Sequence, residues 1–193
     1  MASVPPANNQ LPLLFSDLTP LSSVEHASWK ARANEALPAF ARQHAIPVTI
    51  DEFAIVQRYY PIIFSAGENP VPLALLGLNE GVNTFADSDG KLTEQVYVPA
   101  YVRRYPFLLA RLRDDTDELS LCFDPSAGTI GPFEDGDPLF VDGQPSEAIK
   151  AVLGFCEQFE QAGQRTTAFM QELASAGLLM DGEVSIQVAD SEQ

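Results

Sequence analysis

Apolar residues along the chain follow two spacings, one helical and one extended. From Pro145 to Ala176 the side chains of one stripe recur every three, four or seven residues, which predicts a long amphipathic helix ending at Gly177. The stripe consists of Ile149, Val152, Cys156, Phe159, Thr166, Phe169 and Leu173. Short aliphatic runs bounded by turn-forming residues predict strands instead. These runs are PIIFSAG, VPLALLGL, FLLARL and LSLCFD.

Capping and turn residues mark shorter elements between these segments. Thr49-Ile50-Asp51-Glu52 fits a capping box, so we expect a helix to begin there and to end before Pro61. Asp89-Gly90 supplies a positive-φ turn, which predicts a hairpin over residues 81–98. Residues 22–43 favour a short helix or an extended segment, because Pro38 would break a helix running through it.

The order of these elements predicts an α+β fold. The simplest arrangement is an antiparallel or mixed β-sheet packed on one side by the long C-terminal helix, with short helices inserted between the strands. A loop rich in Pro and Gly, residues 124–145, is expected to be pinned by its own apolar side chains or else to be mobile. We expect one domain over residues 1–193, with a mobile arm at 1–12, a further edge strand in VSIQV and a tail at 184–193.

Charge is distributed unevenly along the chain. The net charge is -16, yet residues 1–113 hold 9 Lys and Arg against 10 Asp and Glu, whereas residues 114–193 hold 2 against 17. Such a field repels nucleic acid, whose binding begins with cationic neutralisation of phosphates. It suits a basic partner or divalent cations, or serves only as a solvated acidic surface.

The N-terminal residues lack the basic region of a secretory leader, and no window approaches the ~18 apolar residues of a membrane span. We therefore expect no membrane insertion. A cytoplasmic location is predicted, with the cell surface by leaderless export as the alternative.

Motifs for catalysis and cofactor binding are missing from the sequence. It contains no G-x-S-x-G, no phosphate-binding loop and no dinucleotide fingerprint, and His26 and His44 lie far apart. Acidic turns such as the one around Asp135 lack the spacing of a calcium loop, and Cys122 and Cys156 sit in apolar contexts typical of buried free thiols. We predict no catalytic residues, no metal site and no cofactor, and we expect that Ca²⁺ is not required for folding.

The stretch YVPAYVRRYPFLL, residues 97–109, is the strongest candidate for a polar site. It places Arg103 beside Arg104 among aromatic residues, in a chain that is otherwise acidic. Consecutive residues of a helix diverge by about 100°, so one arginine is expected to be buried against a carboxylate and the other to meet solvent or a ligand. The pair either captures a carboxylate of a ligand or partner, or forms an internal ion pair with Asp124 or an acidic loop residue. The candidate binding residues are Arg103, Arg104, Tyr97, Tyr101, Tyr105 and Tyr60.

Three sequence blocks occur in the order found in a known family. Y-P-I-x-F, Y-V-P-A-Y-V-R-R-Y-P-F and D-G-x-P-L-F, together with QRTTAF in the long helix, span roughly residues 45–178. This pattern resembles the bacterial SapC family. The resemblance implies a non-catalytic protein, since the family is named for an association with paracrystalline surface layers and has no catalytic residues to carry over.

Two classes of function follow. The first is an interaction protein associated with a surface layer, which uses the Arg and aromatic stretch to bind a protein partner or to self-associate. The second is a small-molecule-binding or enzymatic domain in which Arg103 or Arg104 anchors a small anionic ligand. A closed pocket containing an arginine with a histidine or carboxylate would favour the second class, whereas a flat apolar patch would favour the first.

Overall fold

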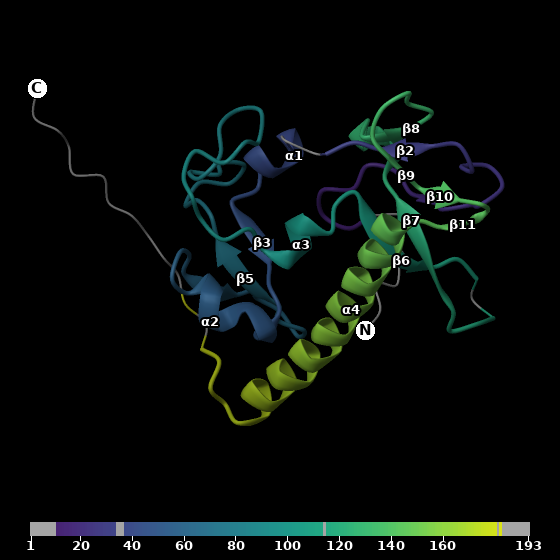
Figure 1. Cartoon of the computed structure of the whole chain (residues 1–193). Helices are drawn as coiled ribbons and strands as arrows, with labels where there is room; N and C mark the ends of the chain where they lie inside the picture. The colour runs from purple at the N-terminus through teal and green to yellow at the C-terminus, as the bar shows by residue number, and fades with distance from the viewer. Residues whose placement is uncertain (1–10, 34–36, 114, 181, 183–193) are drawn as a thin grey trace, which may run out of the picture.

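The structure is a computed structural model, and it describes residues 11–33, 37–113, 115–180 and 182. It is an α+β fold, in which small antiparallel sheets pack around a long C-terminal helix (Figure 1). The expected edge strand in VSIQV, the tail and most of the expected N-terminal arm lie outside the described residues. Within the described ranges, no helix combines the length and apolar character needed to cross a bilayer.

The first sheet has the order β1-β7-β6. β6 (Phe107–Arg111) and β7 (Leu119–Phe123) pair antiparallel along their whole length, and β1 (Thr19–Pro20) pairs with the end of β7. These two longer strands are the predicted runs FLLARL and LSLCFD. The first four residues of β6 are buried, and α4 (Glu147–Ser175) packs against this strand.

The second sheet has the order β3-β5-β4. β5 (Pro72–Leu75) lies in the centre, with β3 (Ala45–Pro47) and β4 (Ile62–Phe64) antiparallel on either side. β4 and β5 confirm the predicted strands in PIIFSAG and VPLALLGL. The strands thus form separate small sheets, and among the described residues every pair of neighbouring strands is antiparallel.

The Pro- and Gly-rich loop forms structure of its own. It contains the 3₁₀ turn η2 (Pro125–Ala127), strands β8 (Ile130–Gly131) and β9 (Asp137–Pro138) paired with β2 (Lys30–Ala31), and the hairpin of β10 (Phe140–Val141) and β11 (Gln144–Pro145). Ile130, Leu139 and Phe140 are buried. The expectation that this loop is held in place by its own apolar side chains is confirmed.

The helices are mostly short. α1 (Pro38–Ala41) begins at Pro38, η1 (Ile50–Glu52) and α2 (Phe53–Val56) follow Thr49, and α3 (Ala100–Arg103) follows Pro99. The helix predicted to run from Thr49 to Pro61 therefore begins where expected but ends at Val56. Pro38 starts a helix instead of interrupting one, because its missing N–H costs nothing in the first turn.

Both ends of α4 are capped, the C-terminal one at Gly177 as predicted. The Ser146 hydroxyl accepts a hydrogen bond from Ile149 N at 3.3 Å. Gly177 has φ of 65°, and Leu178 N donates to Leu173 O at 3.1 Å, the geometry of a Schellman motif. The helix predicted over residues 145–176 is confirmed.

The core consists of two clusters, and α4 contributes to both. One cluster gathers around Ile46, Val56, Tyr60 and Leu76, with Phe159 of α4 packed against it. The other gathers around Phe107, Phe123 and Leu139, and includes Ile149 and Cys156 of α4. The stretch from Tyr97 to Leu109 joins the two clusters, since Tyr101 and Leu108 belong to the first and Phe107 and Leu109 to the second.

Candidate functional site

The two adjacent arginines of α3 have opposite environments. Arg104 is buried, with 3% of its surface exposed, and its guanidinium lies 3.7 Å from the carboxylate of Glu160 on α4. Its Cζ lies 4.4 Å from the ring centroids of both Tyr101 and Phe159. Its Nε has no hydrogen-bond partner among the described residues. Arg104 therefore lies buried between α3 and α4, with its guanidinium facing Glu160 and two aromatic rings.

Arg103 is exposed and is held by its neighbours. Its Nε donates to Val98 O at 3.1 Å, and Nη2 donates to the Tyr97 hydroxyl at 3.0 Å. Its guanidinium also lies 5.1 Å from the ring centroid of Phe155. Arg103 forms no ion pair with a described carboxylate. Its positive charge is thus oriented but not neutralised.

The Tyr97 hydroxyl connects Arg103 to a buried carboxylate. It donates to Glu52 Oε1 at 2.9 Å, and the same oxygen accepts from Ala100 N at 2.7 Å. Glu52 Oε2 accepts from both the backbone N and the hydroxyl of Thr49. The glutamate of the predicted capping box therefore also caps α3. Burial and the nearby Glu52 raise the pKa of Tyr97, which keeps its hydroxyl protonated and able to donate.

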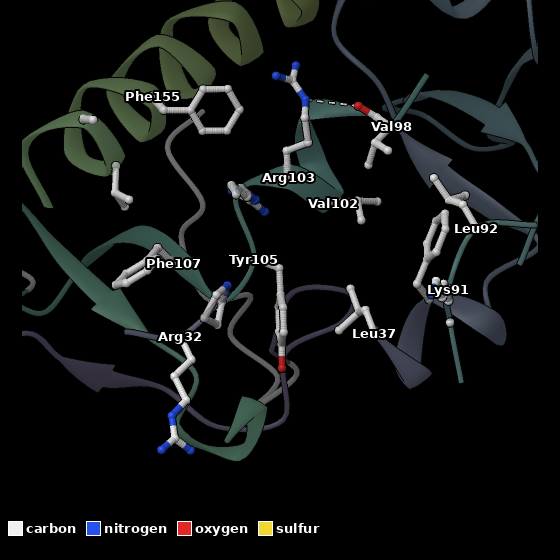
Figure 2. Close-up of a pocket in the computed structure, with 16 residues that line it drawn as sticks. Arg32, Leu37, Lys91, Leu92, Val98, Val102, Arg103, Tyr105, Phe107 and Phe155 are labelled. Carbon is white, nitrogen blue, oxygen red and sulfur yellow. Dashed lines mark hydrogen bonds between the residues drawn. The ribbon is translucent and has the colours of Figure 1, made fainter. Parts of the chain in front are cut away.

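A groove of about 780 Å³ runs beside Arg103 (Figure 2). Its walls come from α1, the hairpin around Gly90, α3, the start of β6 and the first turns of α4. The lining side chains are mostly apolar, including Leu37, Leu92, Val102, Tyr105 and Phe155. Figure 2 shows Arg103 beside Phe155 on one side of this space and Lys91 beside Leu37 and Leu92 on the other.

The charges that line the groove are all positive. Arg32, Lys91, Arg103 and Arg104 line it, and among the described residues no Asp or Glu does. Arg32 is paired with Asp135, and Figure 2 shows its guanidinium directed away from Arg103. Since Arg104 faces Glu160, the uncompensated positive charge of the groove belongs to Lys91 and Arg103.

Lys91 reaches the groove because its hairpin packs closely on α1. Gly90 has φ of 81°, and a Cβ there would lie 1.8 Å from Leu37 O, so only glycine fits this approach. Asp87 Oδ1 accepts from Asp89 N and Lys91 N, which fixes the turn. The predicted hairpin is present in a reduced form, a single antiparallel bridge between Ala86 and Leu92.

The structure separates the candidate binding residues into two groups. Arg103, Arg104 and Tyr105 line the groove, and Tyr97 contacts it through Arg103. Tyr101 and Tyr60 lie elsewhere: Tyr101 lines a second cavity of about 300 Å³ between β5 and α4, and the buried Tyr60 hydroxyl donates to Tyr97 O.

The predicted ion pair of Arg103 or Arg104 with Asp124 does not form. Asp124 is buried and accepts hydrogen bonds from Ser16 N at 2.7 Å and Ser126 N at 2.8 Å. Its nearby charge contributes, after burial, to the raised pKa of Tyr105. The acidic partner of Arg104 comes from α4 instead, because the helix runs across the end of α3.

The groove residues that the sequence did not reveal are Lys91, Leu37 and Phe155. They come from three distant segments, so no local motif connects them. No His, Cys, Ser, Asp or Glu of the described chain lines the groove. Burial raises the pKa of each cysteine thiol to about 11 and disfavours the reactive thiolate.

The structure is an α+β fold with a largely apolar groove whose charged lining residues are all basic. The chain belongs to the SapC family, whose family model matches residues 21–193. No curated protein and no solved structure gives a significant match to it.

Proposed function

We propose that this protein is a non-catalytic interaction protein that binds an acidic, apolar segment of a partner protein in the groove beside Arg103. One observation carries the proposal. The groove is lined by four basic residues and by no described acidic one, in a chain that has 27 Asp and Glu against 11 Lys and Arg. Arg32 and Arg104 are paired with Asp135 and Glu160, so the positive charges that remain for a partner are those of Lys91 and Arg103.

The chemistry of the groove favours an extended partner over a compact substrate. Lys91 and Arg103 lie on opposite sides of an open space whose remaining lining is largely aliphatic and aromatic. A partner segment with carboxylates flanking apolar side chains would meet both features, since charge complementarity sets the register and apolar burial supplies affinity. The membership of the SapC family adds a candidate source of that segment, a protein of a bacterial surface layer. We propose a cytoplasmic location, with the cell surface as the alternative.

Binding of labelled model peptides tests this proposal. An acidic peptide with Glu pairs separated by Leu and Phe is compared, by fluorescence anisotropy, with its Gln and Lys counterparts. The acidic peptide should bind, and binding should weaken as salt is raised. Lys91→Gln and Arg103→Gln should each weaken it roughly tenfold, whereas Arg113→Gln, which removes an equal charge from an exposed pair with Asp115, should leave it unchanged.

Three outcomes would contradict the proposal. One is equal binding of the acidic and neutral peptides, and another is binding that survives both groove substitutions. The third is a failure to bind the peptide combined with a rise in the melting temperature on adding citrate that depends on Lys91 and Arg103. That third result would assign the groove to a small anionic ligand.

A further inference from the structure

A second cavity, of about 300 Å³, lies between β5 and α4, and of its described lining residues it shares only Arg104 with the groove. Val71 marks its outer end, since this side chain is 43% exposed, whereas Arg104 and Met170 are buried and mark its inner end. Most of the wall is apolar and comes from proline, valine, Phe159, Met170 and the side-chain-free Gly163. The cavity therefore leads from the surface to a buried cation.

Arg104 carries the one side-chain donor of this cavity that has no partner among the described residues, its Nε. The four hydroxyl groups that line the cavity each donate to an acceptor of the protein; they belong to Thr49, Tyr101, Thr166 and Thr167. A buried water typically makes about three hydrogen bonds to such groups, and a single unused donor on an apolar wall offers it too few. An apolar molecule with one acceptor matches this lining better than water does.

Charge on the described lining of this cavity is limited to Arg104, whose guanidinium lies 3.7 Å from the carboxylate of Glu160. A carboxylate ligand would add a second negative charge beside this buried pair, and the desolvation of that charge would oppose binding. A carbonyl oxygen accepts a hydrogen bond from the guanidinium and leaves the charge of the pair unchanged. The lining therefore favours an uncharged acceptor over an anion.

We propose that this cavity binds a small, uncharged and largely apolar molecule, a ketone, ester or amide. Its carbonyl oxygen faces the Arg104 guanidinium, and its hydrocarbon part lies between Val71, Phe159 and Met170. The volume admits about ten non-hydrogen atoms, at the ~30 Å³ that a water molecule occupies in the liquid. This size excludes peptides and long-chain lipids. The ligand of this cavity is separate from the partner segment proposed for the groove.

Gly163 supplies the variant that tests the cavity, because it lines this space and a Cβ built there would meet no atom within 4 Å. Gly163→Leu therefore places a side chain in the cavity without a clash. Gly154→Leu is the matched control: Gly154 is a second glycine of α4 with equally open surroundings, and it lines neither the cavity nor the groove. Both replacements raise helix propensity, so a loss of binding in Gly163→Leu alone reports on the cavity.

Three probes of similar size test the ligand class: acetophenone, ethylbenzene and benzoate. Binding is measured from the melting temperature and from amide chemical shifts in NMR titrations. Acetophenone should raise the melting temperature, shift the amides of Val71 and Thr167, and bind about tenfold more tightly than ethylbenzene, which lacks the acceptor. Benzoate should bind about tenfold more weakly than acetophenone, because it adds a negative charge. Gly163→Leu should abolish acetophenone binding, and Gly154→Leu should retain it.

The groove variants separate this site from the proposed peptide binding. Lys91→Gln and Arg103→Gln should leave acetophenone binding unchanged, and Gly163→Leu should leave binding of the acidic peptide unchanged. An absence of saturable acetophenone binding overturns the proposal. So does binding of ethylbenzene or benzoate that is as tight as that of acetophenone, or acetophenone binding that survives Gly163→Leu.

Discussion

The guanidinium of Arg104 lies 3.7 Å from the carboxylate of Glu160, and both side chains are buried. Arg103, the preceding residue, points to the groove and has no described carboxylate beside it. Two adjacent arginines of one helical turn thus have separate roles, one in joining α3 to α4 and one in presenting charge.

This division predicts unequal effects of alanine substitutions. Arg104→Ala should lower the free energy of unfolding by about 3 to 5 kcal/mol, because it leaves Glu160 buried without its cation. Arg103→Ala should lower it by under about 0.5 kcal/mol, since an exposed residue is removed. Urea unfolding monitored by circular dichroism measures both. Equal destabilisation by the two substitutions would refute separate roles.

The buried carboxylate of Glu52 should stabilise the fold more than an exposed carboxylate does. Glu52→Ala removes the acceptor of Thr49 N, Ala100 N and the Tyr97 hydroxyl, so we expect a loss of about 3 kcal/mol in the free energy of unfolding. Glu172→Ala, at an exposed position of α4, should change it by under about 0.5 kcal/mol. A loss in Glu52→Ala no greater than in the Glu172 control would show that the network around Glu52 is not stabilising.

Alkaline pH should destabilise the protein through its tyrosines. Burial raises the pKa of Tyr60 from 10.0 to about 12, and the pKa values of Tyr97, Tyr101 and Tyr105 are also raised. The unfolded chain therefore releases these protons first as pH rises, so stability present below pH 10 is lost progressively between pH 10 and 12.

Thermal melts across this range, with tyrosinate absorbance recorded in parallel, measure the effect. Tyr60→Phe should show a smaller decline in melting temperature with pH than the wild-type protein. A melting temperature that stays constant through this range would contradict the prediction.

Local sequence rules predicted the elements of this fold well. The C-cap and apolar stripe of α4 depend on residues within a few positions of each other, as does the capping box of Thr49 that precedes η1. They can therefore be recognised without tertiary information. The end of α2 at Val56 was missed, because the chain turns there to bring Tyr60 into the core, where its hydroxyl bonds Tyr97 O. The hydrogen bond from Tyr60 to Tyr97 joins segments that are far apart in the sequence, so no local pattern predicts it.

The site was less predictable for the same reason. Arg103 and Arg104 stood out because two adjacent cations are unusual in this chain, and their divergence follows from helix geometry. The identity of Glu160 as the buried partner depends on how α4 crosses α3. Lys91 enters the groove only because Gly90 permits a close approach to Leu37.

Because α4 contributes to both core clusters, the two clusters should not unfold independently. Phe159 packs on the cluster around Tyr60, while Ile149 and Cys156 belong to the cluster around Phe123. Unfolding of either cluster exposes a face of α4 to water. This exposure raises the free energy of a partly unfolded state in which only one cluster remains ordered. The two clusters should therefore unfold in a single cooperative transition, and proteolytic cleavage of α4 near its middle should unfold both of them.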